Sequence, residues 1–113
     1  MLGRVKRKPR SAVGRPARRE AARAQQKLSS ARERLFALEA GGEPGRPLEV
    51  VSAALVDTKA LSVRCPRCDS AHELLEHAAR VIDGVRLREA LLRCRQCGSA
   101  RSLWFRLTGS GQN

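Results

Sequence analysis

A chain of 113 residues with a net charge of +12 is long enough for one small domain and an appended segment, but not for two full domains. No apolar run approaches the roughly 18 residues of a membrane-spanning helix, so we expect no membrane partner. The four cysteines, in a chain that starts without the apolar segment of a secretion signal, predict metal binding in a reducing compartment, the cytoplasm.

The first segment, residues 1–16, is predicted to be a disordered basic arm, because it contains two prolines, two glycines and no acidic residue. Residues 1–40 hold 12 Lys or Arg against 3 Glu, a net charge of +9, whereas residues 41–113 carry only +3. This distribution predicts nucleic-acid binding (DNA or RNA) through phosphate contacts, with little sequence specificity. The candidate residues are Arg4, Lys6, Arg7, Lys8, Arg10, Arg15, Arg18 and Arg19. The alternative is a solvated tail without a ligand.

Residues 17–40 are predicted to form a helix, since strong helix formers dominate and Gly41-Gly42 would end it. Apolar residues recur in steps of three and four and form a seam: Ala21, Ala24, Leu28, Ala31, Leu35 and Leu38. We expect the seam to dock on the rest of the chain; the alternative is a homodimer through residues 21–38. Ser30 and Glu33 also match a capping box, which would break the helix near residue 29.

A Gly- and Pro-rich stretch, residues 41–47, is predicted to be a linker to a domain over residues 48–107. Within the domain, the apolar run from residue 48 to 56 predicts a strand, residues 57–59 a turn, and residues 61–63 a strand leading to the first cysteine. Residues 108–113 are predicted to be a flexible tail.

The cysteines form two matched pairs, Cys65-Pro-Arg-Cys68 and Cys94-Arg-Gln-Cys97, with 25 residues between Cys68 and Cys94. Two such pairs predict one four-thiolate Zn²⁺ site, because each short turn aims two sulfurs at the same ion. The residues after the pairs, Asp69 and Gly98, suit the positive φ that such turns need. A redox dithiol would need only one pair, and iron is the alternative metal for a four-thiolate site.

These residues resemble the zinc-ribbon class, in which a four-cysteine zinc site holds a β-ribbon together, over about residues 61–107. The chain is also similar to small bacterial zinc-ribbon proteins. The resemblance implies the fold and a structural metal, and it implies no particular activity. The fold class that we expect is therefore small α+β: a disordered basic arm, one helix, and an antiparallel β-ribbon held by zinc.

Between the cysteine pairs, residues 71–92 fit two patterns. Their apolar residues follow a helical period reasonably well, but Asp83-Gly84 between two apolar runs is a strong hairpin signal, and we predict a hairpin there. Residues 101–107 alternate between apolar and other residues and predict the last strand. His72 and His77 are interpreted as surface histidines, since four cysteines already complete the metal site.

No catalytic constellation can be assembled, and four cysteines leave zinc no open position for water, so we expect a non-enzymatic protein. The first hypothesis is a nucleic-acid-binding module. Arginines around the cysteine turns would add phosphate contacts: Arg64, Arg67, Arg93, Arg95 and Arg101. Trp104 is the one candidate stacking surface, although a packing role is favoured for it. The second hypothesis is a protein-interaction adapter that uses the helical seam and the ribbon.

Overall fold

The computed structural model describes the backbone of residues 2–109 and the side chains of residues 15–109. Two helices and four strands follow one another along the chain: α1 (Leu2–Leu38), β1 (Leu48–Val50), α2 (Ala54–Leu61), β2 (His72–Ile82), β3 (Val85–Cys94) and β4 (Ala100–Leu107). The protein is therefore a small α+β protein, as the sequence predicted, but with two helices where one was expected. Among the described helices, none is long and apolar enough to cross a membrane.

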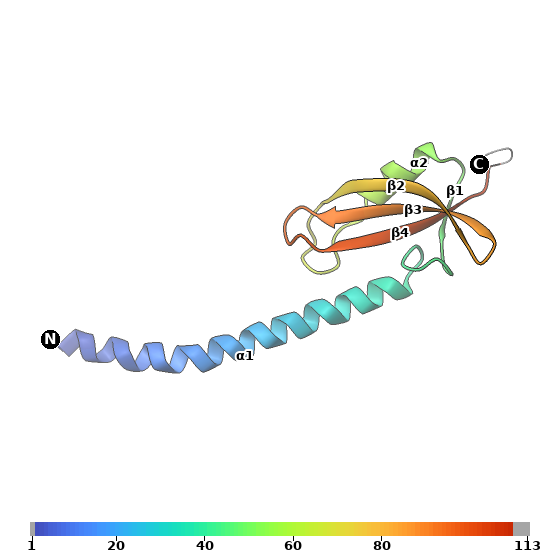
Figure 1. Cartoon of the computed structure of the whole chain (residues 1–113). Coiled ribbons are helices and arrows are strands. Elements are labelled where there is room, and N and C mark those ends of the chain that lie inside the picture. The colour runs from blue at the N-terminus through green and yellow to red at the C-terminus, as the bar shows by residue number, and fades with distance from the viewer. Residues whose placement is uncertain (1, 110–113) are drawn as a thin grey trace.

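The sheet has the strand order β1-β4-β3-β2 and is mixed (Figure 1). Strands β2, β3 and β4 are antiparallel, whereas β1 runs parallel to β4. The expectation of a purely antiparallel ribbon is therefore wrong at this edge. The cause is the path of the chain, since α2 carries it from β1 at one edge of the sheet to β2 at the other.

Helix α2 also replaces a predicted strand and turn. Only residues 48–50 are extended, and the expected turn over residues 57–59 lies inside α2. Val56 and Ala60 explain the difference, because a spacing of four puts them on one side of a helix, where both are completely buried. The apolar run of residues 48–56 is thus divided between a short strand and the start of a helix.

The core lies on the face of the sheet that α2 covers. Leu92, Leu103 and Phe105 are at most 1% exposed and pack in one cluster with Val56 and Ala60. The opposite face carries cross-strand ion pairs instead: Arg80 with Glu89, Arg93 with Glu73, and Arg106 with Glu49. Successive side chains of β3 and β4 point to opposite faces of the sheet, so alternating apolar and charged residues give one buried face and one face with ion pairs.

The predicted hairpin and last strand are both confirmed. Strands β2 and β3 are joined by Asp83 and Gly84 alone, with φ values of 50° and 79°. Positive φ at both positions matches the right-handed twist of a two-residue hairpin, and Asp-Gly is a preferred sequence for it. Strand β4 begins at Ala100, one residue before the predicted start, and ends at Leu107 as expected.

Helix α1 leaves the domain as a long projection (Figure 1), and the described chain extends 79 Å in its longest direction. Residues 15–28 are exposed throughout, and partial burial begins at Ser29. The helical backbone begins at Leu2, where a helix was expected only from residue 17, and it is continuous past the expected break near residue 29. A helix without tertiary contacts is marginal in water, so disorder over residues 1–16 stays a prediction.

Residues 41–47, the predicted linker, form a folded turn. The Gly41 carbonyl accepts a hydrogen bond from the Trp104 N–H at 2.9 Å, and the Arg46 guanidinium donates to the Ala37 carbonyl at 3.0 Å, near the end of α1. Gly41 has φ of 89°, and a Cβ there would lie 2.8 Å from the Leu48 side chain. This turn fixes where α1 ends against the sheet. At the other end of the domain, Thr108 donates to the Val50 carbonyl, and residues 110–113 of the predicted tail lie outside the described part.

Candidate metal centre and basic surface

The two cysteine turns have the same backbone hydrogen bonds. The Cys65 N–H donates to the Ser70 carbonyl and the Cys94 N–H to the Ser99 carbonyl, both at 2.9 Å. The Asp69 and Gly98 N–H groups donate back to the carbonyls of Cys65 and Cys94. Asp69 and Gly98 have φ of 63° and 77°, which confirms the predicted positive φ after each pair.

These turns bring all four sulfurs together. The Sγ atoms of Cys65, Cys68, Cys94 and Cys97 lie within 4.8 Å of one another. The Sγ atoms of Cys65 and Cys97 are 3.8 Å apart and those of Cys68 and Cys94 are 3.4 Å apart, too far for disulfides and close to the roughly 3.8 Å expected around one tetrahedral zinc ion. The cluster could therefore hold one metal ion, which is compatible with a zinc-ribbon-like motif.

The polar surroundings of Cys65 favour its thiolate form over its thiol form. The Arg67 N–H donates to the Cys65 sulfur at 3.4 Å, and the N–H groups of Gln96 and Cys97 donate to the Cys94 sulfur at 3.3 and 3.4 Å. Burial raises the pKa of Cys65, but hydrogen bonds from the Arg67 and Cys68 backbone and from Ser99 and Cys97 outweigh burial and lower this pKa to about 6. Because metals bind the thiolate form, this environment favours metal binding at neutral pH.

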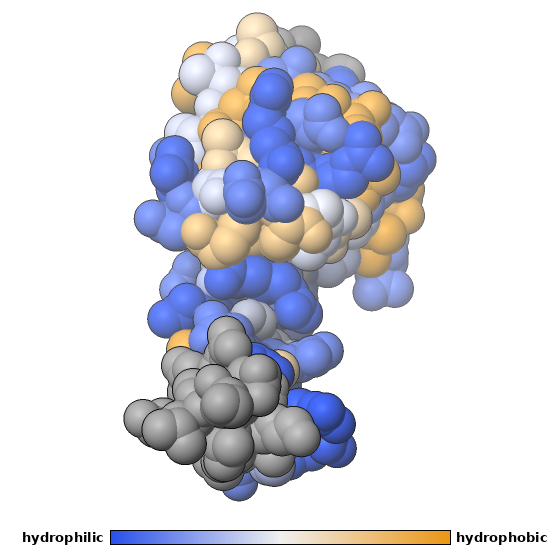
Figure 2. Space-filling model, turned by 90° about the vertical axis from the view of Figure 1, so that its left-hand side faces the viewer, coloured by the Kyte–Doolittle hydropathy of each residue, from blue (hydrophilic) through white to orange (hydrophobic). Residues whose placement is uncertain are grey.

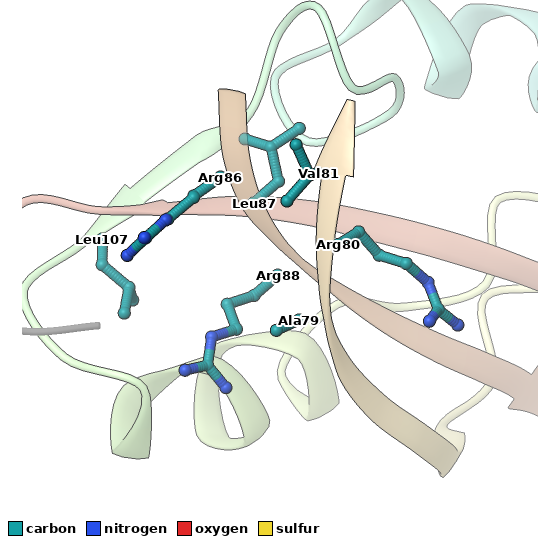
Figure 3. Close-up of a pocket in the computed structure, with 7 residues that line it drawn as sticks. All are labelled: Ala79, Arg80, Val81, Arg86, Leu87, Arg88 and Leu107. Atoms are coloured by element: carbon teal, nitrogen blue, oxygen red, sulfur yellow. The ribbon is translucent and has the colours of Figure 1, made fainter. Parts of the chain in front are cut away.

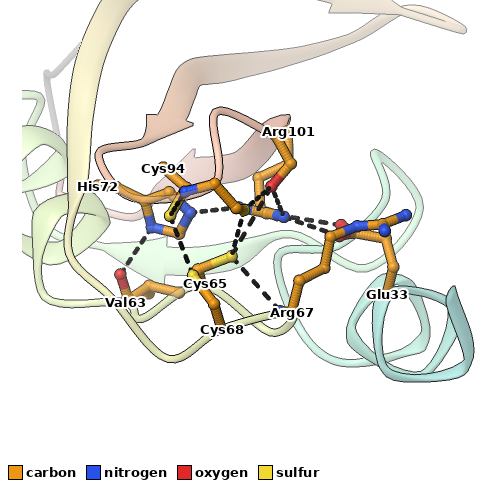
Figure 4. Close-up of polar contacts among 10 residues, drawn as sticks. Glu33, Val63, Cys65, Arg67, Cys68, His72, Cys94 and Arg101 are labelled. Atoms are coloured by element: carbon orange, nitrogen blue, oxygen red, sulfur yellow. Dashed lines mark hydrogen bonds and ion pairs between the residues drawn. The ribbon is translucent and has the colours of Figure 1, made fainter. Parts of the chain in front are cut away.

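A buried arginine lies between this cluster and helix α1 (Figure 4). The Arg101 side chain is only 4% exposed, and its guanidinium donates to Glu33 of α1 from Nε at 3.0 Å and from Nη2 at 2.7 Å. Hydrogen bonds from Arg101 are the main cause that holds the pKa of Glu33 below its ordinary value, against the effect of burial. Burial lowers the pKa of Arg101, but Glu33 outweighs it and raises that pKa. Both groups are therefore charged at neutral pH.

His72 belongs to the same network, so its interpretation as a surface histidine is wrong. It is 3% exposed, its Nδ1 lies 2.8 Å from the Val63 carbonyl, and its Nε2 contacts the Arg101 guanidinium. Burial is the main cause that lowers its pKa, so His72 is neutral, with Nδ1 donating and Nε2 accepting. His77 is also largely covered and pairs with Asp57 at 2.8 Å. His72 alternates with Leu74, but His77 follows His72 by five residues, and only the register shift between Leu74 and Glu76 brings both histidines to the covered face, which alternation along the sequence could not predict.

Three of the five arginines predicted to add phosphate contacts around the cysteine turns are already paired with carboxylates. Arg67 and Arg101 share Glu33, and Arg93 pairs with Glu73 at 2.7 Å. Arg64 lies 3.8 Å from Asp69, a long contact between exposed groups. Glu33, assigned to a capping box, is instead the partner of two arginines that follow it by 34 and 68 residues. Local sequence patterns could not reveal pairings over such separations.

The basic residues of α1 present a different surface. Of the predicted contacts, Arg15, Arg18 and Arg19 are exposed, and Arg4, Lys6, Arg7, Lys8 and Arg10 precede the described side chains. Further exposed basic residues follow on the same helix, and the prediction had omitted them: Arg23, Lys27, Arg32 and Arg34. Arg15, Arg19, Arg23 and Lys27 recur every four residues, which gives one basic stripe along the helix. Figure 2 looks along α1 from its N-terminal end and shows a largely hydrophilic helix surface beyond the grey atoms.

The apolar seam of α1 is not what docks on the domain. Leu28, Leu35 and Leu38 are 46%, 61% and 62% exposed, so the expectation that the seam packs against the rest of the chain is wrong. Phe36 and Glu33 dock instead, since Phe36 packs against the core cluster and lies under the Arg101 guanidinium, 5.9 Å from ring centre to carbon. The helix therefore docks through Glu33 and Phe36, and Leu35 only lines a hollow beside this contact, together with Val63 and Pro66.

A second basic location lies beside the hairpin, where a hollow of about 340 Å³ opens between β2, β3 and the end of β4 (Figure 3). The side chains of Arg86 and Arg88 point to the same side of β3, whereas Arg80 points away toward Glu89. Neither Arg86 nor Arg88 has a carboxylate partner within the described part of the chain, and the lining includes no acidic residue. Two arginines over apolar walls could contact an anionic group.

Comparison of this chain with protein-family models, with curated proteins and with solved structures found no match.

Proposed function

We propose that the four cysteines hold one structural zinc ion in a zinc-ribbon-like domain, and that this non-enzymatic domain presents the basic helix α1 to nucleic acid. Zinc is favoured over other metals because four thiolates with no remaining ligand are typical of structural zinc sites. Cys65 and Cys94 are only 2% exposed, so the metal would stabilise the fold and would not be accessible to a substrate.

Nucleic-acid binding is proposed because the basic residues on α1 are exposed and are not paired with carboxylates. From Arg15 to Arg34, seven exposed Lys and Arg side chains have no ion-pair partner among the described residues: Arg15, Arg18, Arg19, Arg23, Lys27, Arg32 and Arg34. The two glutamates of the same span are Glu20 and Glu33, and Glu33 is occupied by the domain. A rod with this charge suits the phosphate backbone of DNA or RNA, which it would recognise by charge and not by sequence.

The salt dependence of binding tests this proposal. We expect Arg19→Gln/Arg23→Gln to reduce the slope of log affinity against log salt by about 1.4 to 1.8, because each lost phosphate contact removes about 0.7 to 0.9. Lys59→Gln/Arg106→Gln removes the same charge from the domain and should leave the slope nearly unchanged. Equal slopes for the two double variants would contradict binding through α1. The probes are a 20-base single strand and a 20-base-pair duplex of mixed sequence.

The exposed seam favours a second candidate, a protein-interaction adapter. Leu28, Leu35 and Leu38 lie outside the domain, and an apolar helix face of this kind binds a groove or another helix. A second copy of the chain through residues 21–38 is one such partner. Binding through the seam would persist in high salt, whereas phosphate binding would fall steeply, and this difference separates the two functions.

A further inference from the structure

Glu33 is the one residue of α1 that forms ion pairs with the domain within the described part of the chain. Its carboxylate receives three hydrogen bonds: from Arg67 Nε at 3.0 Å, from Arg101 Nε at 3.0 Å and from Arg101 Nη2 at 2.7 Å. The Glu33 side chain is 27% exposed and the Arg101 side chain 4%, so at least the Arg101 half of the contact is held away from water. Removing the Arg101 charge from water has a cost, which the hydrogen bonds to Glu33 offset only when their geometry is good.

The two arginines belong to different cysteine turns. Arg67 lies between Cys65 and Cys68, and its N–H also donates to the Cys65 sulfur at 3.4 Å. Arg101 follows the second turn and donates from Nη2 to the Ser99 hydroxyl at 2.9 Å. The Ser99 hydroxyl lies 3.1 Å from the Cys97 sulfur and 3.7 Å from the Cys65 sulfur. One carboxylate on α1 is thus linked to both turns, through Arg67 alone to the Cys65 sulfur and through Arg101 and Ser99 to the Cys97 sulfur.

We propose that Glu33 is a positioning residue that couples metal occupancy of the four-cysteine centre to the docking of helix α1. The metal would hold the two turns together, and only then do both guanidiniums converge on one carboxylate. When the metal leaves, the turns separate, Glu33 loses its partners, and α1 detaches together with Phe36. The inference rests on the metal-binding half of the proposed function and not on its nucleic-acid half.

Coupling of this kind is reciprocal. If the metal stabilises the docked helix, the docked helix must strengthen metal binding by the same factor. Residues that orient metal ligands through hydrogen bonds typically change metal affinity by about 10- to 100-fold when they are replaced. We expect an effect of this size from Glu33, although it contacts no sulfur itself.

The test uses zinc-loaded full-length protein and compares Glu33→Gln with Glu20→Gln, which removes the same charge from an exposed position on the same helix. Zinc affinity is measured by competition with a chromophoric chelator, and helix docking by amide hydrogen exchange in residues 29–38. We expect Glu33→Gln to lower zinc affinity about 10- to 100-fold and to speed exchange in this segment, with both properties unchanged in Glu20→Gln.

Equal zinc affinity and equal exchange in the two variants would overturn the coupling. Failure of the unaltered protein to bind zinc would instead refute the metal centre itself, so the two failures are distinguishable. If Glu33→Gln also loses amide protection across residues 72–94, the sheet itself is destabilised, and weaker zinc binding would not prove coupling. Phe36→Ala is then the deciding variant, because it weakens the docking of α1 without removing a charge. Coupling requires weaker zinc binding in Phe36→Ala, and unchanged zinc affinity would overturn it.

Discussion

The domain and helix α1 use arginine in opposite ways. Most domain arginines have a carboxylate within reach: Arg46, Arg64, Arg67, Arg80, Arg93, Arg101 and Arg106. Along α1, the described arginines are exposed and have no such partner. Arginine side chains therefore form ion pairs within the domain, whereas those on α1 remain available to an external anion.

The domain pairs are themselves of two kinds. Arg80, Arg93 and Arg106 pair across an open sheet face where both partners retain contact with water, and exposed pairs of this kind contribute about 0 to 1 kcal/mol. Arg101 is the exception, because it is buried between α1 and the cysteine turns. The surface pairs neutralise charge on the domain, whereas the buried pair fixes its geometry.

Removal of the metal centre should have the largest effect. We expect Cys94→Ser to abolish metal binding and unfold residues 48–107, because a domain this small has too little core to fold without its metal. Elemental analysis measures the metal, and circular dichroism with hydrogen exchange measures the fold. An ordered sheet in this variant, or in the unaltered protein with excess chelator, would show that the sulfur cluster is not what holds the domain.

Replacement of paired arginines should separate the two kinds of pair. Arg101→Ala leaves His72 without its partner and Glu33 with Arg67 alone in a covered site, and we expect it to lower the free energy of unfolding by about 3 to 5 kcal/mol. Arg93→Ala removes an exposed pair with Glu73 and should cost about 0 to 1 kcal/mol. Urea unfolding of the zinc-loaded proteins measures both values. Similar costs for the two variants would remove the distinction between buried and surface arginines.

The outward side of α1 should matter least to stability. Leu35 is 61% exposed, so Leu35→Asp should change the free energy of unfolding of the domain by less than about 0.5 kcal/mol. If the seam joins two copies of the chain, the same variant should be monomeric where the unaltered protein is dimeric. Sedimentation at several concentrations gives the size, and Leu38→Asp is a matched second position. A large loss of domain stability would mean that the seam contacts the domain after all.

The features that the sequence predicted well depend on local chemistry. The cysteine spacing, the positive φ after each pair and the Asp83-Gly84 hairpin are each set by a few neighbouring residues, and the structure contains all of them. The alternation of β4 predicted its strand for the same reason, since each second side chain enters the core.

The features that the sequence did not reveal depend on contacts between distant segments. Glu33 meets Arg101 across 68 residues, and this contact decides which side of α1 faces the domain. Helix α2 was missed because Leu55 and Val56 suit a strand as well as a helix, and only burial of Val56 and Ala60 under the sheet chooses between them. The apolar seam had the correct period for docking, but it could not show that a buried ion pair would dock the opposite side.

The most direct test of the division between the two regions is nucleic-acid binding by full-length protein and by a chain lacking residues 1–28. The removed residues include those exposed from Arg15 to Leu28, while the contacts of Glu33, Phe36 and the cysteine turns remain, so the domain should still fold. Across a salt series, the full chain should bind with log affinity falling by about 0.7 to 0.9 per phosphate contact, and the shortened chain, which keeps only Arg32 and Arg34 of the exposed basic residues on α1, should bind weakly and with a much shallower slope. Equal affinity and equal slope for the two proteins would contradict the account, because the domain alone would then supply the phosphate contacts.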